Sequence, residues 1–173
     1  MDYPTALWAA LRLGVVPSCA NPIYTPHELV HQLKLSRSQF ILTHPLFVKT
    51  AIAAAKEVGI PESNILLVSK ADNLPFLTLP DILEIGESAP EIVPLRLTRG
   101  ESKRKVALLN FSSGTSGLAK GVLITHANVI ANVCQLYIHE GAGRGNWEGT
   151  ANGCLPFFHS NVSFAKANIK FTA

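Results

Sequence analysis

The sequence predicts an α/β fold, with a mostly parallel sheet and helices on both faces. Helix-like and strand-like segments alternate over the first 70 residues, as in βαβ units, whose strands run parallel. Apolar residues make up 47% of the chain and charged residues only 16%. That balance fits strands buried on both faces, or a piece of a larger protein whose remainder covers apolar surface.

Helices are expected where apolar side chains recur at helical spacing between recognisable ends. Gly14 and Gly59 are placed to end two of them, because glycine adopts the left-handed conformation that closes a helix. Another begins at a capping box, Thr25 to Glu28, with proline at the first helical position. Thr125 can cap the last helix. The expected helices cover residues 3–13, 26–35, 45–58, 80–85 and 126 to about 139.

Strands are expected at short apolar runs bounded by turn residues. They cover residues 39–43, 65–69, 105–110 and 121–125, with a shorter strand-like segment at 151–155. We divide the chain into a βαβ subdomain (1–71), a proline-rich connection (72–100), a strand–loop–strand–helix region (101–159) and a tail (160–173). The connection reads either as a linker between two subdomains or as an excursion before the next strand.

Charge and cysteine content exclude several classes of protein. A formal net charge of +3 is too small to indicate nucleic-acid binding. The basic cluster at residues 96–105 contains Glu101 and no aromatic residue, as in a solvated loop. Cys19, Cys134 and Cys154 have neither the even number of a disulfide framework nor the spacing of a zinc site, and they favour a reducing compartment.

Targeting signals and membrane spans leave recognisable patterns in a sequence. No apolar run approaches the roughly 18 residues that span a bilayer, and the first residues lack the basic start of a secretory signal. The last three residues are no peroxisomal address. We therefore expect a cytoplasmic protein without a membrane span, and the sequence identifies no protein partner or oligomeric state.

The strongest candidate for function is the loop between the strands expected at 105–110 and 121–125. From Ser112 to Gly121 it reads SSGTSGLAKG. Glycines let a backbone pass close to a ligand, and successive amides in such a turn bind anions. Four hydroxyls can donate to phosphate oxygens, and Lys120 adds a positive charge. These groups fit a polyphosphate; a flexible Ser/Gly hairpin that merely joins two strands is the alternative.

The loop is not a Walker A motif, because Lys120 follows Ala119 rather than glycine and precedes Gly121 rather than Ser or Thr. The string SSGTSGLAKGVLITHANV instead resembles the phosphate-binding signature of the adenylate-forming superfamily of acyl-CoA synthetases, luciferases and peptide-synthetase adenylation domains. The usual form has Thr at Ser116 and Pro at Ala119. The first change keeps a hydroxyl, and the second loosens the loop but keeps Lys120.

The resemblance implies roles for particular residues. His159, which ends the string LPFFH, resembles a family histidine beside the acyl and adenylate pocket, although a histidine after two phenylalanines is by itself more often structural. The segment at residues 20–29 resembles 4-coumarate-CoA-ligase-like members, and after His159 the resemblance ends. The ATP phosphate contacts implied by the resemblance are Ser112, Ser113, Gly114, Thr115, Ser116, Gly117 and Lys120.

The activity implied by the resemblance is that of an acid–CoA ligase. A carboxylic acid, aromatic or fatty, reacts with ATP to give an acyl-adenylate, and CoA then displaces AMP. The later family motifs supply a glutamate for Mg²⁺, an aspartate for the ribose and a lysine of a mobile carboxy-terminal domain, and none has a counterpart here. We therefore expect a fragment that keeps the phosphate loop but has no metal ligand and no complete catalytic set.

Two alternatives stay open at this point. The chain could be a catalytically inert remnant that binds nucleotide or another protein, or a truncated gene product. A peroxisomal location also stays open for the full-length parent.

Overall fold

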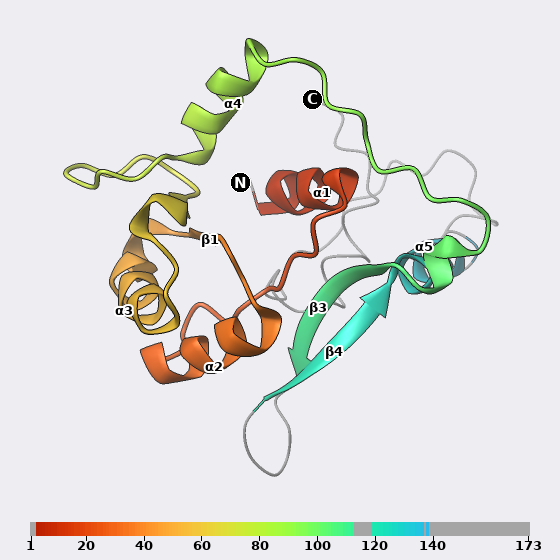
Figure 1. The fold of residues 1–173 in the computed structure, drawn as a ribbon, viewed down its shortest axis with the longest axis horizontal. Helices are drawn as coiled ribbons and strands as arrows, with labels where there is room; N and C mark the ends of the chain where they lie inside the picture. The colour runs from red at the N-terminus through yellow and green to blue at the C-terminus, as the bar shows by residue number, and fades with distance from the viewer. Residues whose placement is uncertain (1–2, 113–118, 137, 139–173) are drawn as a thin grey trace.

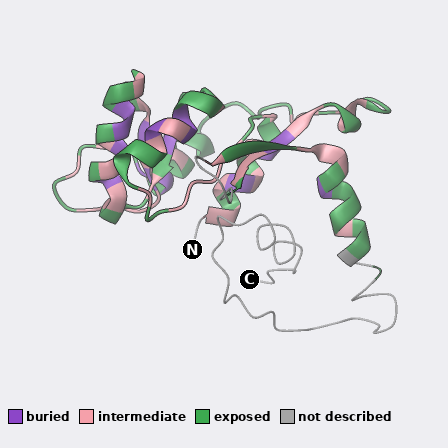
Figure 2. Cartoon of the chain, turned by 90° about the horizontal axis from the view of Figure 1, so that it is seen from below, coloured by how far each residue is buried: buried purple, intermediate pink, exposed green. Residues whose placement is uncertain are grey.

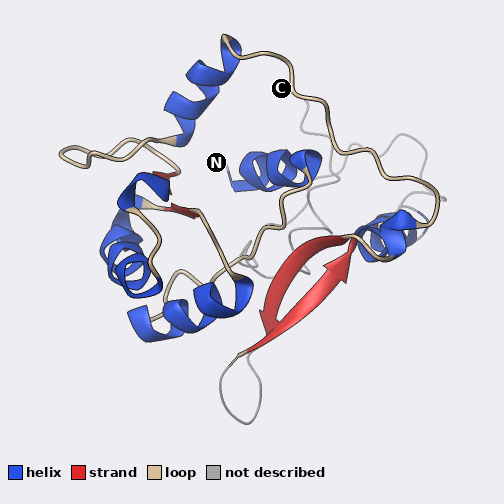
Figure 3. Cartoon of the chain, in the orientation of Figure 1, coloured by secondary structure: helices blue, strands red, loops and turns tan. Residues whose placement is uncertain are grey.

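The computed structural model describes residues 3–112, 119–136 and 138 (Figure 1). The expected strand at 151–155 and the tail at 160–173 lie outside the described residues. Single 3-10 turns occur at Pro45–Phe47, Glu62–Asn64 and Glu101–Lys103. The helices and strands, coloured in Figure 3, are α1 (Tyr3–Leu13), α2 (Pro26–Ser36), β1 (Ile41–Thr43), α3 (Val48–Val58), β2 (Ile65–Leu67), α4 (Leu79–Glu87), β3 (Val106–Ser112), β4 (Lys120–Thr125) and α5 (His126–Leu136).

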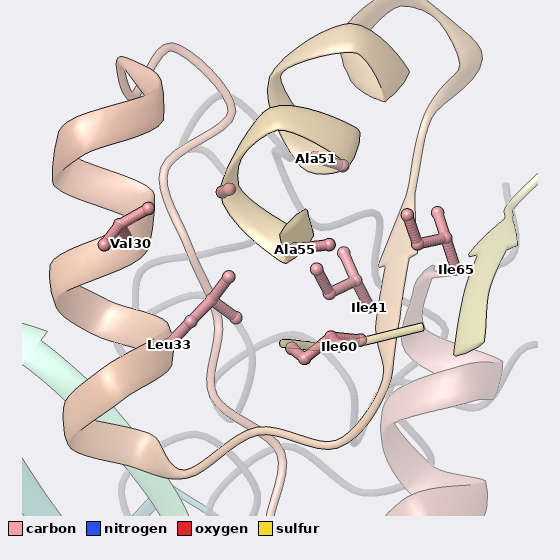
Figure 4. Close-up of a cluster of buried hydrophobic side chains, with 8 residues drawn as sticks. Val30, Leu33, Ile41, Ala51, Ala55, Ile60 and Ile65 are labelled. Carbon is pink, nitrogen blue, oxygen red and sulfur yellow. The ribbon is translucent and has the colours of Figure 1, made fainter. Parts of the chain in front are cut away.

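The first part of the chain forms the predicted βαβ unit. β1 and β2 pair in parallel, with Ile41 opposite Ile65 and Thr43 opposite Leu67, and α3 connects them. Three alanines of α3 leave room for α2 and the two strands to approach closely, so one apolar core forms between them (Figure 4). The buried residues of this core are Val30, Leu33, Ile41, Ala51, Ala54, Ala55, Ile60 and Ile65.

Both ends of α2 are fixed by local hydrogen bonds. The Glu28 amide donates to the Thr25 hydroxyl, and the Thr25 amide donates to the Glu28 carboxylate at 2.8 Å, which confirms the predicted capping box. The Thr25 hydroxyl also donates to this carboxylate, at 2.7 Å. The bonds to the carboxylate, first from the Thr25 amide and then from its hydroxyl, lower the pKa of Glu28. At the other end Arg37 adopts the left-handed conformation and donates its amide to the Leu33 carbonyl. Gly59 ends α3 as predicted, at φ +79°.

β3 and β4 form a second sheet, whose pairing differs from the mostly parallel arrangement expected of the sheet as a whole. The two strands run antiparallel, with Leu109 opposite Leu123 and Ser112 opposite Lys120. Parallel neighbours need a crossover of a dozen or more residues, whereas only residues 113–119 separate these strands. Within the described residues, the α/β class is therefore built from two separate two-stranded sheets, one parallel and one antiparallel.

A second core lies where α1 packs against the base of the hairpin. Its buried residues are Leu7, Leu11, Ala107, Leu108 and Val129. The segment after α1 runs along β3, where the Leu109 amide donates to the Pro17 carbonyl at 3.1 Å. The connection from α4 then runs past the carboxyl end of α1 to the start of β3 (Figure 1), and its Leu95 amide donates to the Arg12 carbonyl at 2.7 Å.

Burial is uneven between the two sheets. β4 has no buried residue, and most of α5 is exposed, whereas the βαβ unit encloses buried side chains (Figure 2). In the part of the chain that the structure describes, none of the helices combines the length and the apolar character that crossing a bilayer requires.

Candidate functional site

The loop that the sequence singles out joins two residues that face each other across the hairpin. β3 ends at Ser112 and β4 begins at Lys120, and the two are register partners. Directly opposite residues of an antiparallel pair project from the same face, with Cβ atoms about 5 Å apart. The Ser112 hydroxyl also donates to the Lys120 carbonyl at 3.5 Å. The side chains of Ser112 and Lys120, both exposed residues, thus project from the same face of the hairpin where the loop begins and ends.

The Lys120 ammonium has no carboxylate partner among the described residues. The lysines that form ion pairs there are Lys34, at 3.0 Å from Glu57, and Lys70, at 3.2 Å from Asp81. An exposed cation without a competing carboxylate can bind an incoming anion without first breaking an ion pair. This property is the one that phosphate binding requires of Lys120.

The opposite face of the hairpin end is closed by apolar side chains. A Cβ atom placed on Gly121 would lie 3.2 Å from Leu109 Cδ1 and 3.6 Å from Phe111 Cζ. A side chain at this position would require Leu109 to move by a few tenths of an ångström, so glycine fits most easily beneath these two side chains. The hairpin end has an apolar face and a polar face, and the predicted ligands Ser112 and Lys120 belong to the polar one.

One contact at the loop was not predicted. The Nε2–H of His31, on α2, donates to the Ala119 carbonyl at 2.9 Å, and both residues are partly buried. Ala119 directly precedes Lys120. The two partners are 88 residues apart, and a histidine within an amphipathic helix carries no local sign of such a bond. Only the tertiary arrangement shows it.

The central predicted ligands lie outside the described residues. They are Ser113, Gly114, Thr115, Ser116 and Gly117, together with the predicted pocket residue His159. The structure thus brings Ser112 and Lys120 together at the base of the loop, and the binding roles of all eight residues stay predictions.

Within the described part of the chain, other chemically active groups do not form a second centre of this kind. The Tyr3 hydroxyl donates to the Cys19 sulfur at 2.7 Å, and burial raises the pKa of that thiol, so it stays protonated and unreactive. No group of three His, Cys, Asp or Glu side chains that could hold a metal occurs among the described residues. An apolar groove of about 430 Å³ lies at the far end of the hairpin, lined by Trp8, Leu11, Arg12, Leu95, Leu97, Ala107, His126, Val129 and Ile130.

Comparison with known proteins adds an independent line of evidence. The profile of the family described as "AMP-binding enzyme" matches residues 1–164. The acyl-CoA ligase AFT1-1 of Alternaria alternata is 36% identical over 146 residues, which are 81% of this chain and 25% of that protein. The 4-coumarate–CoA ligase 3 of Arabidopsis thaliana is 34% identical over 134 residues, 78% of this chain and 22% of that protein. The chain thus spans about a quarter of the length of these curated relatives.

Solved structures agree with these sequence matches. The crystal structure of a long-chain-fatty-acid-CoA ligase from Archaeoglobus fulgidus superimposes with a TM-score of 0.76 and 27% identity, covering 96% of this chain and 30% of that one. The fold is therefore that of the amino-terminal part of an adenylate-forming enzyme. With a family profile that extends over most of its length and acyl-CoA ligases among its relatives, the chain belongs to the AMP-binding enzyme family.

Proposed function

We propose that this chain forms the phosphate-binding part of an acid–CoA ligase that activates a carboxylic acid as an acyl-adenylate before thioester formation. The ATP phosphates would lie at the loop end of the β3–β4 hairpin. Ser112, residues 113–117 and Lys120 would bind them through hydroxyls, backbone amides and one ammonium group. The supporting observation is the pairing of Ser112 with Lys120 on one exposed face, where Lys120 has no described carboxylate partner.

The chemistry of these groups suits adenylation. When a carboxylate attacks the α-phosphate, negative charge builds on the phosphate oxygens and on the departing pyrophosphate. Donors fixed before the reaction stabilise that charge without reorganising. Lys120 would supply the positive charge and Ser112 a hydroxyl, and CoA would accept the acyl group afterwards. Mg²⁺ at such sites is usually held by one or two carboxylates together with substrate phosphates and water, and no carboxylate of this chain is assigned to it.

The acid substrate is proposed at the level of its class. Relatives are a 4-coumarate–CoA ligase and long-chain-fatty-acid–CoA ligases, so both aromatic and fatty acids fit, and His159 would lie beside the acyl group. By itself the chain would bind nucleotide through its loop and turn over little. The other reading is a remnant that binds without any catalysis.

Titration calorimetry of the 173-residue chain with ATP, and separately with inorganic tripolyphosphate, tests the proposal. Both ligands should bind, and Lys120→Ala should weaken each about tenfold or more, because a hydrogen bond to a charged group contributes about 1.5–3 kcal/mol. Lys49→Ala removes an exposed lysine of α3 and should leave both affinities unchanged. Failure of the unmodified chain to bind either ligand would refute the proposal.

A pyrophosphate-release assay separates the two readings. The purified chain is incubated with ATP, Mg²⁺, CoA and a panel of aromatic and fatty acids. Slow release that Lys120→Ala abolishes would indicate residual ligase chemistry. Binding without any release above that of Lys120→Ala would favour the inert remnant.

A further inference from the structure

We propose that His31 is a positioning residue for the phosphate loop: its hydrogen bond to the Ala119 carbonyl fixes the backbone from which Lys120 extends. The bond joins the βαβ unit to the hairpin across 88 residues, at 2.9 Å. The effect of this bond on ATP binding rests on the function proposed above. Its effect on the stability of the hairpin does not depend on that function.

His31 is a firm point of attachment because α2 is itself held in place. Its first turn is fixed by the Thr25 capping box and its last by the left-handed residue Arg37. Val30 and Leu33, on either side of His31 in the sequence, are 4% and 7% exposed and point toward α3 (Figure 4). A side chain carried by a packed and capped helix can hold a neighbouring loop, whereas one on a frayed helix would move with it.

The held carbonyl matters because of where it lies in the chain. The Ala119 carbonyl and the Lys120 amide belong to one planar peptide group, so fixing one fixes the other. The carbonyl on the other side of Lys120 accepts the Ser112 hydroxyl at 3.5 Å. Both peptide groups that flank the Lys120 Cα are therefore held, and with them the direction in which its side chain leaves the backbone.

The residue type at 119 makes an outside attachment useful. Proline would lock φ at this position, but alanine leaves it free. Ala119 thus gives the loop more backbone freedom directly before the cation that is proposed to bind phosphate. The hydrogen bond from His31 restricts the Ala119 backbone from outside the loop, whereas a proline at this position would restrict it through its own ring.

Two substitutions separate the hydrogen bond from the volume of the ring. His31→Phe keeps an aromatic ring but removes the donor, and His31→Gln keeps an N–H donor on a side chain of similar length. His27→Phe, at an exposed histidine of the same helix, is the matched control. All three are compared with the unmodified 173-residue chain by circular dichroism, so that a general loss of folding is seen directly.

The first measurement needs no ligand. Hydrogen–deuterium exchange of the β4 amides should become several-fold faster in His31→Phe at the Lys120 end of the hairpin, and less so at the Thr125 end. His31→Gln should restore the slower exchange, and His27→Phe should not change it. Equal exchange in His31→Phe and the unmodified chain would overturn the proposal, because the bond would then hold nothing.

The second measurement concerns the anion. His31→Phe should weaken binding of ATP and of inorganic tripolyphosphate about three- to tenfold, the range expected for loss of one positioning hydrogen bond, and His31→Gln should stay within about twofold of the unmodified chain. Faster exchange with unchanged affinities would overturn the positioning role. So would an affinity loss that His31→Gln does not restore and that accompanies a lower melting temperature. If the unmodified chain binds neither anion, the proposed function fails, and the exchange data alone decide whether His31 holds the hairpin.

Discussion

The βαβ unit and the β3–β4 hairpin differ in how they bury their apolar side chains. Both strands of the βαβ unit contribute buried positions, and Ile65 and Leu67 are 1% and 0% exposed. In the hairpin β3 contributes the buried residues Ala107 and Leu108 to a core, whereas β4 contributes no buried residue, and its Val122 and Leu123 are 48% and 64% exposed. The first unit is stabilised by its own packing. The second depends on α1 and α2 for its position and presents apolar surface of the kind that interfaces cover.

The sharpest test of this difference is a pair of truncations, one in each sheet. Ile65→Ala should lower the free energy of unfolding by about 3 kcal/mol, since a fully buried aliphatic side chain leaves a cavity. Leu123→Ala should change it by about 0.5 kcal/mol or less, as at other exposed positions. Urea unfolding followed by circular dichroism measures both. Equal losses would show that β4 is packed as tightly as β2 and would remove the contrast.

Features that depend on nearby residues could be predicted from the sequence, and features that depend on distant partners could not. The bounds of α1, the capping box of α2 and the glycine that ends α3 were all predicted, because each depends on side chains within one helical turn. The strand predicted at 39–43 is shorter, Ile41–Thr43, and Phe40 lies outside it and is 61% exposed. An apolar run indicates a strand, but which of its residues are buried depends on partners elsewhere in the chain.

In the candidate site, too, features that depend on neighbouring residues were predicted, and features that depend on distant residues were not. Ser112 and Lys120 were predicted from their neighbours in the loop, and the register of the hairpin places them together. His31 was missed because its partner is distant in sequence. The antiparallel pairing follows from the short loop between the two strands, which leaves no room for a crossover. Residues chosen for chemistry can be found locally, whereas those that position them are found only in the fold.

Two helix caps offer a second, smaller test of the comparison. Thr25 caps α2 in the packed unit, and Thr125 caps α5 beside the open hairpin, where the Asn128 amide donates to its hydroxyl at 3.3 Å. Loss of such a cap costs about 1 kcal/mol. Thr25→Ala should lower the global free energy of unfolding by that amount, because α2 is part of the core.

Thr125→Ala should act more locally. We expect faster amide exchange in α5 with a smaller change in global stability, since an exposed helix can fray without opening the core. Serine at either position keeps the hydroxyl and should restore most of the effect. If Thr125→Ala destabilised the whole chain as much as Thr25→Ala, α5 would be part of the same cooperative unit, contrary to its exposure.

The smallest effect concerns His126, which begins α5. Burial, and then the positive charge of Lys105, hold the pKa of His126 below its ordinary value of about 6.5. The unfolded chain therefore binds a proton at His126 more readily than the folded chain does. By linkage, the contribution of His126 to stability is complete above about pH 6.5 and is lost as pH falls through the lower pKa of the folded state.

Urea titration at pH 8 and at pH 5 measures the free energy of unfolding at each pH. This free energy should fall between pH 8 and pH 5, and it should fall less in His126→Gln. Lys105→Gln should also reduce the loss, by less, because it removes only the second of the two causes. Raising the salt concentration should shrink the part due to Lys105 and leave the part due to burial. An identical pH dependence in the unmodified chain and His126→Gln would contradict this prediction. It would mean that the junction of β4 and α5 is as exposed to water as the outer face of β4. The base of the hairpin would then lack the partial burial that the structure shows there.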